Sequence, residues 1–230
     1  MPSNEHGQPV GFDLSGWTSP AVPEPRVLSG RTVEVSPLDL DRDVGPLFAA
    51  LSTAPESIWT YMAFGPFPDA SDLADTFRRM CDDPSWQPYT IRVAGSPAGF
   101  ASYLRIQPTD GVIEIGAITL SPAMQRTTAA TEALYLMIRN VFDQGYRRCE
   151  WKSDDLNEAS RVAAERLGFR YEGTFAQATH YKGRNRDTAW YAIIDREWPT
   201  LDDAFTRWLD PENFDDQGRQ RASLKEMREQ

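Results

Sequence analysis

The chain has 230 residues, of which 40% are hydrophobic and 25% are charged, and its formal net charge is −10 at pH 7. This composition is typical of a soluble folded domain and excludes disordered and fibrous proteins. The acidic excess argues against a nucleic-acid partner, because nonspecific phosphate binding requires clustered lysine and arginine side chains.

The predicted elements follow one another in a simple order. Residues 1–26 are rich in proline, glycine and serine and predict an irregular arm. Hydrophobic periodicity then predicts a strand, two helices, three strands, a helix, a strand, a helix and two strands. Their ranges are 31–38, 43–52, 69–83, 89–95, 98–106, 111–120, 121–142 (opened by a turn), 147–153, 156–168, 169–182 and 186–198.

The connections between these elements predict the fold class. Gly-Ser-Pro and Pro-Thr-Asp-Gly separate the three central strands, which indicates an antiparallel meander, and Gly-Arg-Asn joins the last two as a hairpin. The order predicts a mixed α/β domain of the α+β type, with helices packed on a largely antiparallel sheet. We expect this domain to span 27–199. Residues 200–230 hold an amphipathic patch (Leu201, Phe205, Trp208, Leu209) and a polar tail.

The segment 121–142, SPAMQRTTAATEALYLMIRNVF, opens an amphipathic helix without a large side chain in its first turn. Its periodicity buries Ala130, Leu134, Met137 and Val141. The first amides of a helix are unpaired and the helix dipole favours negative charge, so a diphosphate could approach this turn closely. Ordinary N-capping explains the same residue types, and the segment alone leaves both interpretations open.

The run from Ile113 to Gly173, which begins IEIGAITL and ends ERLGFRYEG, resembles the GNAT acyltransferase superfamily, and within it the RimJ/RimL-like N-acetyltransferases. The similarity covers residues 30–198. It implies the GNAT fold, acetyl-CoA as co-substrate, and direct transfer of the acetyl group to a primary amine of a small molecule or a protein N-terminus. A catalytically inactive acyl-CoA-binding or regulatory protein is the alternative. Thr128 stands where the family has glycine, and Ala164 where many relatives have tyrosine.

The resemblance assigns the pyrophosphate of acetyl-CoA to the turn and the first helical residues. The family pattern is Gln or Arg, two variable residues, Gly, one variable residue, and Gly or Ala. It matches Gln125, Thr128 and Ala130. The candidate pyrophosphate residues are Gln125, Arg126, Thr127, Thr128, Ala129 and Ala130. Because Thr128 is β-branched, the loop is expected to have ordinary backbone angles at this position.

The strand 111–120 carries the second set of candidates. By resemblance, backbone groups of Ile118, Thr119 and Leu120 bind the pantetheine arm, and an amide among them stabilises the oxyanion. Glu114 is the candidate general base, because an ammonium group must lose a proton before it attacks. The competing interpretation is that Glu114 is a solvated carboxylate on the outer face of the strand.

The helix 156–168 carries the third set. Its period places Leu156, Ala159, Ala163 and Leu167 on a buried face. Asn157 either caps this helix or, by resemblance, contacts the cofactor arm. Ser160 is the candidate catalytic and cofactor-binding residue near the sulfur. With Ala164 at the usual tyrosine position, Ser160 would relay a proton or stabilise charge.

The acceptor side is less defined. By the fold analogy, the last hairpin lies near the acceptor, with His180, Tyr181, Arg184, Asn185, Arg186 and Asp187 as flanking groups. Trp59, Tyr61 and Phe64 either shape the acceptor pocket or belong to the core. The identity of the amine stays open, as does the oligomeric state, which allows a homodimer.

Metal and membrane partners are not expected. Cys81, Cys149, His6 and His180 are isolated and have no metal-ligand or disulfide spacing. The apolar runs are far shorter than the roughly 20 residues that cross a bilayer, and residues 1–9 lack the basic and apolar regions of a signal peptide. We therefore expect a cytoplasmic protein.

Overall fold

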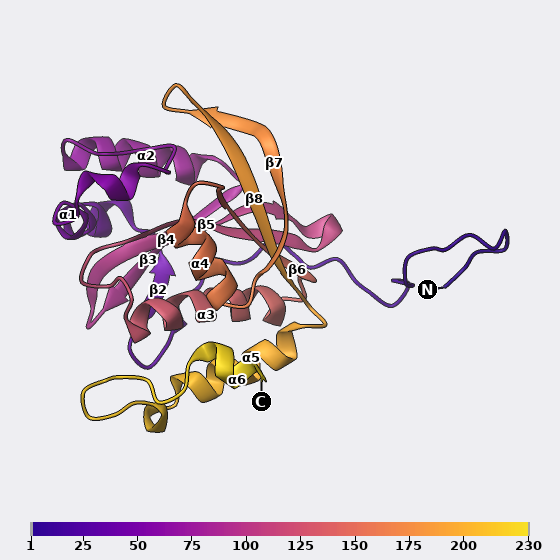
Figure 1. Ribbon diagram of the computed structural model, residues 1–230. Coiled ribbons are helices and arrows are strands. Elements are labelled where there is room, and N and C mark those ends of the chain that lie inside the picture. Colours follow the sequence, from indigo (N-terminus) through magenta and orange to yellow (C-terminus); the bar gives the residue numbers. More distant parts are fainter. Residues whose placement is uncertain (1, 230) are drawn as a thin grey trace.

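The computed structural model describes residues 2–229 as an eight-stranded sheet with helices on both faces (Figure 1). The strand order is β1-β2-β3-β4-β5-β6-β8-β7, and only β5 and β6 are parallel. The strands are β1 (Leu28–Ser29), β2 (Glu34–Pro37), β3 (Trp86–Val93), β4 (Ser96–Gln107), β5 (Val112–Leu120), β6 (Arg148–Asp154), β7 (Arg170–Tyr181) and β8 (Arg184–Ile194). The predicted fold class, a mixed and mostly antiparallel sheet flanked by helices, is confirmed.

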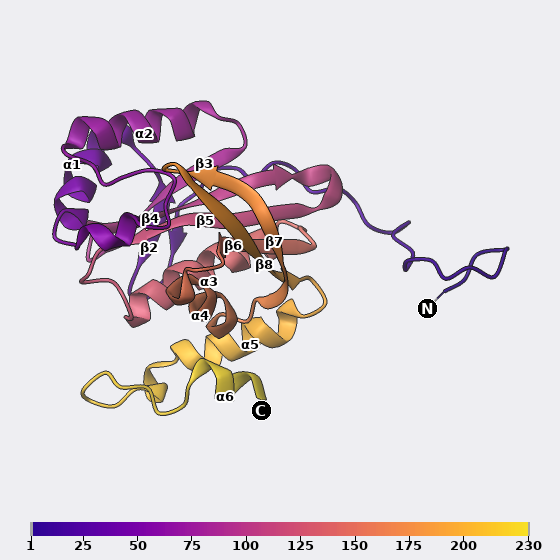
Figure 2. The same cartoon turned by 45° about the horizontal axis from the view of Figure 1, so that its top comes forward.

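The helices lie on both faces of the sheet, and the C-terminal ones lie beyond the layer that covers one face (Figure 2). They are α1 (Leu40–Leu51), α2 (Ala70–Asp82), α3 (Thr128–Asp143), α4 (Glu158–Arg166), α5 (Trp198–Leu209) and α6 (Leu224–Glu229), with single 3₁₀ turns at 56–59, 108–110 and 211–213. One hydrophobic core lies between the sheet and α1 and α2, and a larger one lies under α3 and α5. Among residues 2–229, the structure contains no helix with the length and apolar character that a bilayer span requires.

From β2 to β8 the element order agrees with the prediction, whereas β1, α5 and α6 were not predicted as elements. A side-chain cap accounts for one shifted boundary. Helix α1 begins three residues earlier than predicted because the Asp39 carboxylate accepts hydrogen bonds from the amides of Asp41 and Arg42. The buried face predicted for α3 is confirmed, with Leu134 and Val141 both under 7% exposed. The amphipathic patch after residue 200 forms the buried side of α5.

A buried carboxylate fixes the start of α3 relative to the sheet. Glu132 accepts hydrogen bonds from the amides of Arg31 and Thr32 at 2.7 and 2.8 Å, so the turn between β1 and β2 closes onto the helix. A side chain at Gly30 would meet the Glu132 carboxyl carbon at 2.7 Å. These amides are used by Glu132, which explains why β2 begins at Glu34 and not at the predicted residue 31.

The residues before β1 fall into two parts. Residues near the N-terminus project away from the body of the molecule (Figures 1 and 2), and Phe12 is 67% exposed. The following residues lie against the protein. Tyr146 donates a hydrogen bond to the Ala21 carbonyl at 3.0 Å, and Gln87 donates one to the Pro23 carbonyl at 2.7 Å.

A second buried carboxylate attaches α1 to the sheet. Asp43 is fully buried and accepts hydrogen bonds from Arg42, from the Thr90 hydroxyl and from the guanidinium of Arg92 on β3. Burial alone would raise the pKa of Asp43, but the hydrogen bonds from Arg42, Thr90 and Arg92 outweigh it and lower the pKa to about 2. Asp43 is therefore ionised throughout the physiological range.

We expect Asp43→Ala to lower the free energy of unfolding at pH 7 by about 3–5 kcal/mol, because it leaves the Arg92 guanidinium buried without its carboxylate. The unfolded carboxyl has a pKa near 3.8. The stabilisation should be complete above that value and lost as the pH falls toward 2, so the gap between parent and variant should narrow on acidification. Urea unfolding at several pH values measures it. Asp41→Ala, an exposed position in the same helical turn, is the control, and a pH-independent gap would contradict this account.

Candidate active site

Strands β5 and β6 diverge in the middle of the sheet. They pair only through residues 112–114 and 148–150. Beyond Glu114, β5 continues along β4 as far as Leu120, while β6 continues along β8 as far as Asp154. In the described part of the chain, the β6-facing backbone groups of residues 115–120 therefore have no strand partner. The candidates Ile118, Thr119 and Leu120 lie along this open edge.

A β-bulge redirects the backbone at the opening. The register shifts so that Ala101 of β4 stands opposite both Ala117 and Ile118 of β5. Ala117 has φ of +52°, a left-handed conformation that is uncommon for a residue other than glycine. Bulges of this kind occur near active sites, where they re-aim backbone groups. Ala117 was not among the predicted site residues, because alanine has no preference for positive φ.

The start of α3 combines a cap with free amides. The Thr127 hydroxyl accepts a hydrogen bond from the Ala130 amide at 3.2 Å and donates one to the Met124 carbonyl at 2.7 Å. Within residues 2–229, nothing accepts a hydrogen bond from the amides of Thr128 and Ala129. A capping side chain and free amides thus coexist at the start of α3. The interpretation as a helix cap is therefore compatible with the interpretation as a site that a diphosphate could approach.

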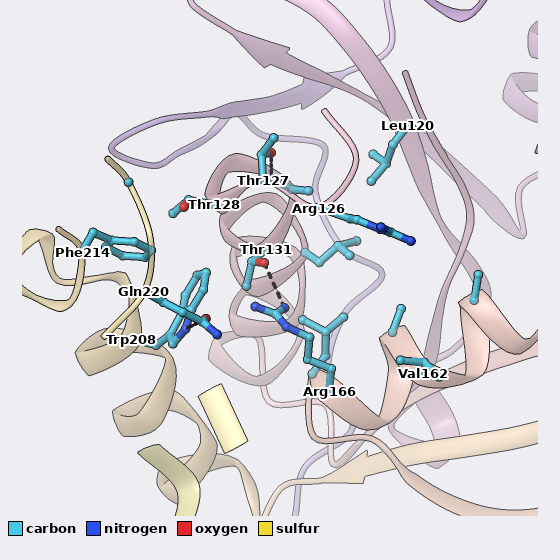
Figure 3. A pocket seen from close by; sticks show the side chains of 16 residues that line it. Leu120, Arg126, Thr127, Thr128, Thr131, Val162, Arg166, Trp208, Phe214 and Gln220 are labelled. Carbon is cyan, nitrogen blue, oxygen red and sulfur yellow. Dashed lines mark hydrogen bonds between the residues drawn. The ribbon is translucent and has the colours of Figure 1, made fainter. Parts of the chain in front are cut away.

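The turn before α3 takes its positive φ at Arg126, at +61°, while Thr128 is helical as expected. The Gln125 side chain folds back and donates a hydrogen bond to the Leu120 carbonyl at 3.0 Å. Gln125 therefore stabilises the turn, whereas Arg126 lines a neighbouring cavity (Figure 3).

This cavity, about 530 Å³ in volume, lies between α3, α4, the end of α5 and the segment that follows it (Figure 3). It falls within the usual range of small-molecule sites. Five predicted cofactor residues line it: Leu120, Arg126, Thr127, Thr128 and Ala130. The opposite wall was not predicted from the sequence; it includes Arg166, Trp208, Phe214 and Gln220. Among these four residues, only Trp208 was singled out from the sequence, as part of the amphipathic patch.

Helix α4 lines the cavity as well, and its predicted buried face is partly wrong. Leu156 is 76% exposed and precedes the helix, and Ala159 is also exposed. The helix packs against the sheet through Ala164 and Leu167, which are buried. Ala159 instead faces the cavity.

Asn157 and Ser160 lie at the start of α4. The Asn157 carboxamide accepts a hydrogen bond from the Ser160 amide at 3.1 Å, which is the capping contact expected from the sequence. The Ser160 hydroxyl accepts a hydrogen bond from the indole of Trp151 on β6 at 3.0 Å. An acceptor site of the hydroxyl is thereby occupied, and its proton is left available for donation.

Glu114 is the last residue of β5 that pairs with β6, so its carboxylate lies at the vertex of the opening. It is 6% exposed, which rules out a solvated surface carboxylate. Its partners are Lys152, with Nζ at 2.8 Å, and Arg105, with Nε at 3.9 Å. Lys152 also contacts Glu150 at 2.9 Å. Burial raises the pKa of Glu114, and the charge of Lys152 opposes this shift only in part.

The two candidate catalytic groups lie on opposite faces of the sheet. Trp151 binds Ser160 and Lys152 binds Glu114, and these are consecutive residues of β6. Successive side chains of a strand point to opposite faces. Ser160 therefore lies on the face with α3, α4 and the cavity, and Glu114 lies on the face with α1 and α2.

The tip of the last hairpin approaches the segment after α1 (Figure 1). The Lys182 ammonium donates a hydrogen bond to the Trp59 carbonyl at 2.7 Å, and the Tyr181 hydroxyl donates one to Asp154 at 2.6 Å. Trp59 is buried against Phe67, with ring centroids 5.1 Å apart, so its side chain belongs to the core. His180 is exposed. Residues 2–229 contain no group of three or more side chains arranged to hold a metal ion.

Comparison with known proteins agrees with this geometry. The family model described as acetyltransferase (GNAT) domain matches residues 33–170. A GCN5-related N-acetyltransferase from Brucella melitensis is 40% identical, with a TM-score of 0.91 over 94% of this chain and 100% of that one. A probable GNAT-family acetyltransferase from Chromobacterium violaceum is 36% identical, with a TM-score of 0.79 over 83% of this chain and 97% of that one.

A more distant structure shares the fold alone. It is the Salmonella typhimurium acetyltransferase that modifies the N-terminal serine of ribosomal protein L7/L12, 21% identical, with a TM-score of 0.64 over 74% of this chain and 99% of that one. No curated protein matches the sequence. The divergent strands, the cavity beside α3 and the family match lead to one conclusion: the chain has the GNAT fold and belongs to the GNAT family of acetyl-CoA-dependent acyltransferases.

Proposed function

We propose that the protein transfers the acetyl group of acetyl-CoA directly to a primary amine, either of a small molecule or of a protein N-terminus. The observation that carries this proposal is the placement of Glu114 and Ser160 on opposite faces of one opening in the sheet. Direct transfer requires the amine and the thioester to approach the same point from different sides. It also requires one group that accepts a proton and another beside the leaving sulfur.

The residues on the α3 face fit acetyl-CoA. The free amides of Thr128 and Ala129 and the guanidinium of Arg126 suit a pyrophosphate in a protein whose overall charge is unfavourable to anions. The open edge of residues 115–120 offers backbone groups to the pantetheine amides. When bound, acetyl-CoA supplies the activated acyl carbon.

The remaining chemistry is assigned to the chain's own groups. Glu114 accepts a proton from the ammonium group of the acceptor, directly or through one water, and the neutral amine that results attacks the acyl carbon. Backbone amides beside the bulge at Ala117 stabilise the negative charge that develops on the carbonyl oxygen. Ser160 donates or relays a proton toward the leaving sulfur, because the tyrosine position of many relatives is Ala164, which is fully buried here.

The acceptor belongs to the same proposal. The resemblance to the RimJ/RimL-like branch supports an N-terminal or small-molecule amine, and the net charge of −10 favours cationic acceptors. A panel of peptides with free N-termini, amino-acid derivatives, polyamines and aminoglycosides, assayed by release of free CoA, tests activity and acceptor class together.

Acetyl-CoA should stabilise the protein, and Thr128→Glu should abolish this effect. At 100-fold above its Kd the ligand contributes about 2.7 kcal/mol, which corresponds to roughly 5–10 °C in Tm. Glutamate at Thr128 is tolerated by the helix dipole but places a carboxylate where the diphosphate approaches. Thermal unfolding with and without acetyl-CoA measures both effects.

Ser71→Glu, in the exposed first turn of α2, is the matched control and should keep the full shift. If Thr128→Glu responds to acetyl-CoA as the parent does, the start of α3 is only a helix cap. If the parent shows no shift at millimolar acetyl-CoA, the cofactor assignment is wrong.

Glu114→Gln should lower kcat/KM at neutral pH by roughly 10²- to 10⁴-fold while changing acetyl-CoA affinity little, because it removes the proton acceptor and keeps the size of the side chain. Raising the pH should partly rescue the variant, since more of the amine is then already neutral. CoA release on the best amine of the panel, from pH 6 to 10, measures this.

Glu172→Gln is the control, because Glu172 belongs to a neighbouring ion pair with Arg148 on β6. Full turnover of Glu114→Gln at every pH would show that Glu114 has no role in the mechanism, whereas the proposed acetyltransferase activity would still hold. A parent protein that binds acetyl-CoA but releases no CoA with any amine would favour the regulatory alternative.

A further inference from the structure

One wall of the cavity comes from residues outside the region that the family model matches, which ends at residue 170. We call this the C-terminal wall: Trp208, Phe214, Gly218 and Gln220. Trp208 packs edge-on against Phe214, with ring centroids 5.3 Å apart, and its indole donates a hydrogen bond to Gln220 at 2.9 Å. Contacts among its own side chains therefore stabilise the C-terminal wall.

Asn213 closes this segment. Its carboxamide nitrogen donates hydrogen bonds to the carbonyls of Trp208 and Ala222 at 3.0 and 3.1 Å, and its oxygen accepts one from the Ala222 amide at 2.9 Å. Asn213 is buried. The loop that carries Gly218 and Gln220 is thus tied at both ends.

Arg166 on α4 lies between the C-terminal wall and α3 (Figure 3). It donates a hydrogen bond to the Thr131 hydroxyl at 3.0 Å, and its guanidinium lies 5.0 Å from the centre of the Trp208 ring. Stacking on the indole and the bond to Thr131 hold the guanidinium in one orientation at the cavity surface.

No carboxylate of residues 2–229 forms an ion pair with Arg166, although the chain has 34 acidic and 24 basic side chains. The other arginine of α4, Arg161, does have such a partner, Asp155 at 3.5 Å. Arg166 as a residue is exposed, but partial loss of water around its guanidinium and the repulsion of Arg228 lower its pKa.

We propose that Arg166 binds the 3′-phosphate of CoA and that the C-terminal wall holds the adenosine end, with Trp208 as the positioning residue. This rests on the proposed use of acetyl-CoA. CoA carries phosphate at two separate places, and the cavity offers two separate arginines that form no ion pair with a carboxylate of the described residues. Arg126 adjoins the free amides of α3, whereas Arg166 lies beside Thr131 and the C-terminal wall. A guanidinium suits phosphate because it donates two parallel hydrogen bonds.

A purely structural role gives a different expectation. If Arg166 only attaches α5 to α4 through Trp208, its loss would weaken every ligand of the cavity equally and would lower the stability of the free protein. Recognition of the 3′-phosphate instead affects only ligands that contain this group. Comparison of CoA with 3′-dephospho-CoA separates the two roles.

Calorimetric titration of the full chain with CoA and with 3′-dephospho-CoA tests the proposal. The parent should bind CoA about tenfold or more tightly than 3′-dephospho-CoA, the preference expected from one hydrogen-bonded charge pair. Arg166→Met should bring this ratio close to one by weakening CoA alone. Arg161→Met, on the same helix but outside the cavity lining, should keep the ratio of the parent.

A parent ratio near one, or an unchanged ratio in Arg166→Met, would overturn the proposal. If Arg166→Met does not fold, the ratio of the affinities for CoA and 3′-dephospho-CoA, measured in the parent and in Arg166→Lys, still decides between the two roles. Lysine keeps the charge of Arg166 but loses its paired hydrogen-bond donors. Failure of the parent to bind either compound would refute the proposed function itself, whereas equal binding of both would refute only the role of Arg166.

Discussion

The site depends on the point at which two parallel strands stop pairing. β5 and β6 are joined only as far as Glu114 and Glu150, and beyond them each strand follows its other neighbour. The divergence leaves the backbone edge of residues 115–120 without a strand partner in the described chain. The cavity beside α3 and α4 opens on one face, and the Glu114 carboxylate lies at the vertex on the other.

The charges at the site are determined by neighbouring side chains, because the protein as a whole is acidic. Glu114 is buried between two cations, Lys152 and Arg105, and Lys152 is shared with Glu150. A buried carboxylate of this kind costs free energy unless it is paired, and it responds strongly to the removal of either cation. The α3 face has the opposite arrangement, in which cations lie without carboxylates of the described chain to pair with them. Arg126 and Arg166 have no acidic partner among residues 2–229, which makes this cavity suited to an anion.

The sequence predicts the element order, the meander, the hairpin and the face of α3, because each follows from local periodicity and turn residues. It also predicts a possible cap at the start of α3 and one at Asn157, although not that Thr127 is the capping residue or which amides stay free. The bulge at Ala117 could not be predicted, since alanine has no preference for positive φ. Leu156 was assigned to the wrong side because α4 begins after it. Glu114 pairs with Lys152, 38 positions away, and Arg166 with Trp208, 42 positions away. Hydrophobic periodicity is local and does not predict contacts between residues so far apart in the sequence.

Hydrogen–deuterium exchange in the presence and absence of acetyl-CoA tests most directly the claim that the divergent strands form the acyl-donor site. The backbone edge of residues 115–120 has no strand partner on the β6 side among the described residues. Binding should therefore slow exchange in the peptide that covers this edge and in the peptide that begins α3. The peptide of α2, which packs in the separate core on the other face of the sheet, should be unchanged. If acetyl-CoA raises Tm while exchange at residues 115–120 stays the same, the cofactor binds elsewhere and the account is wrong.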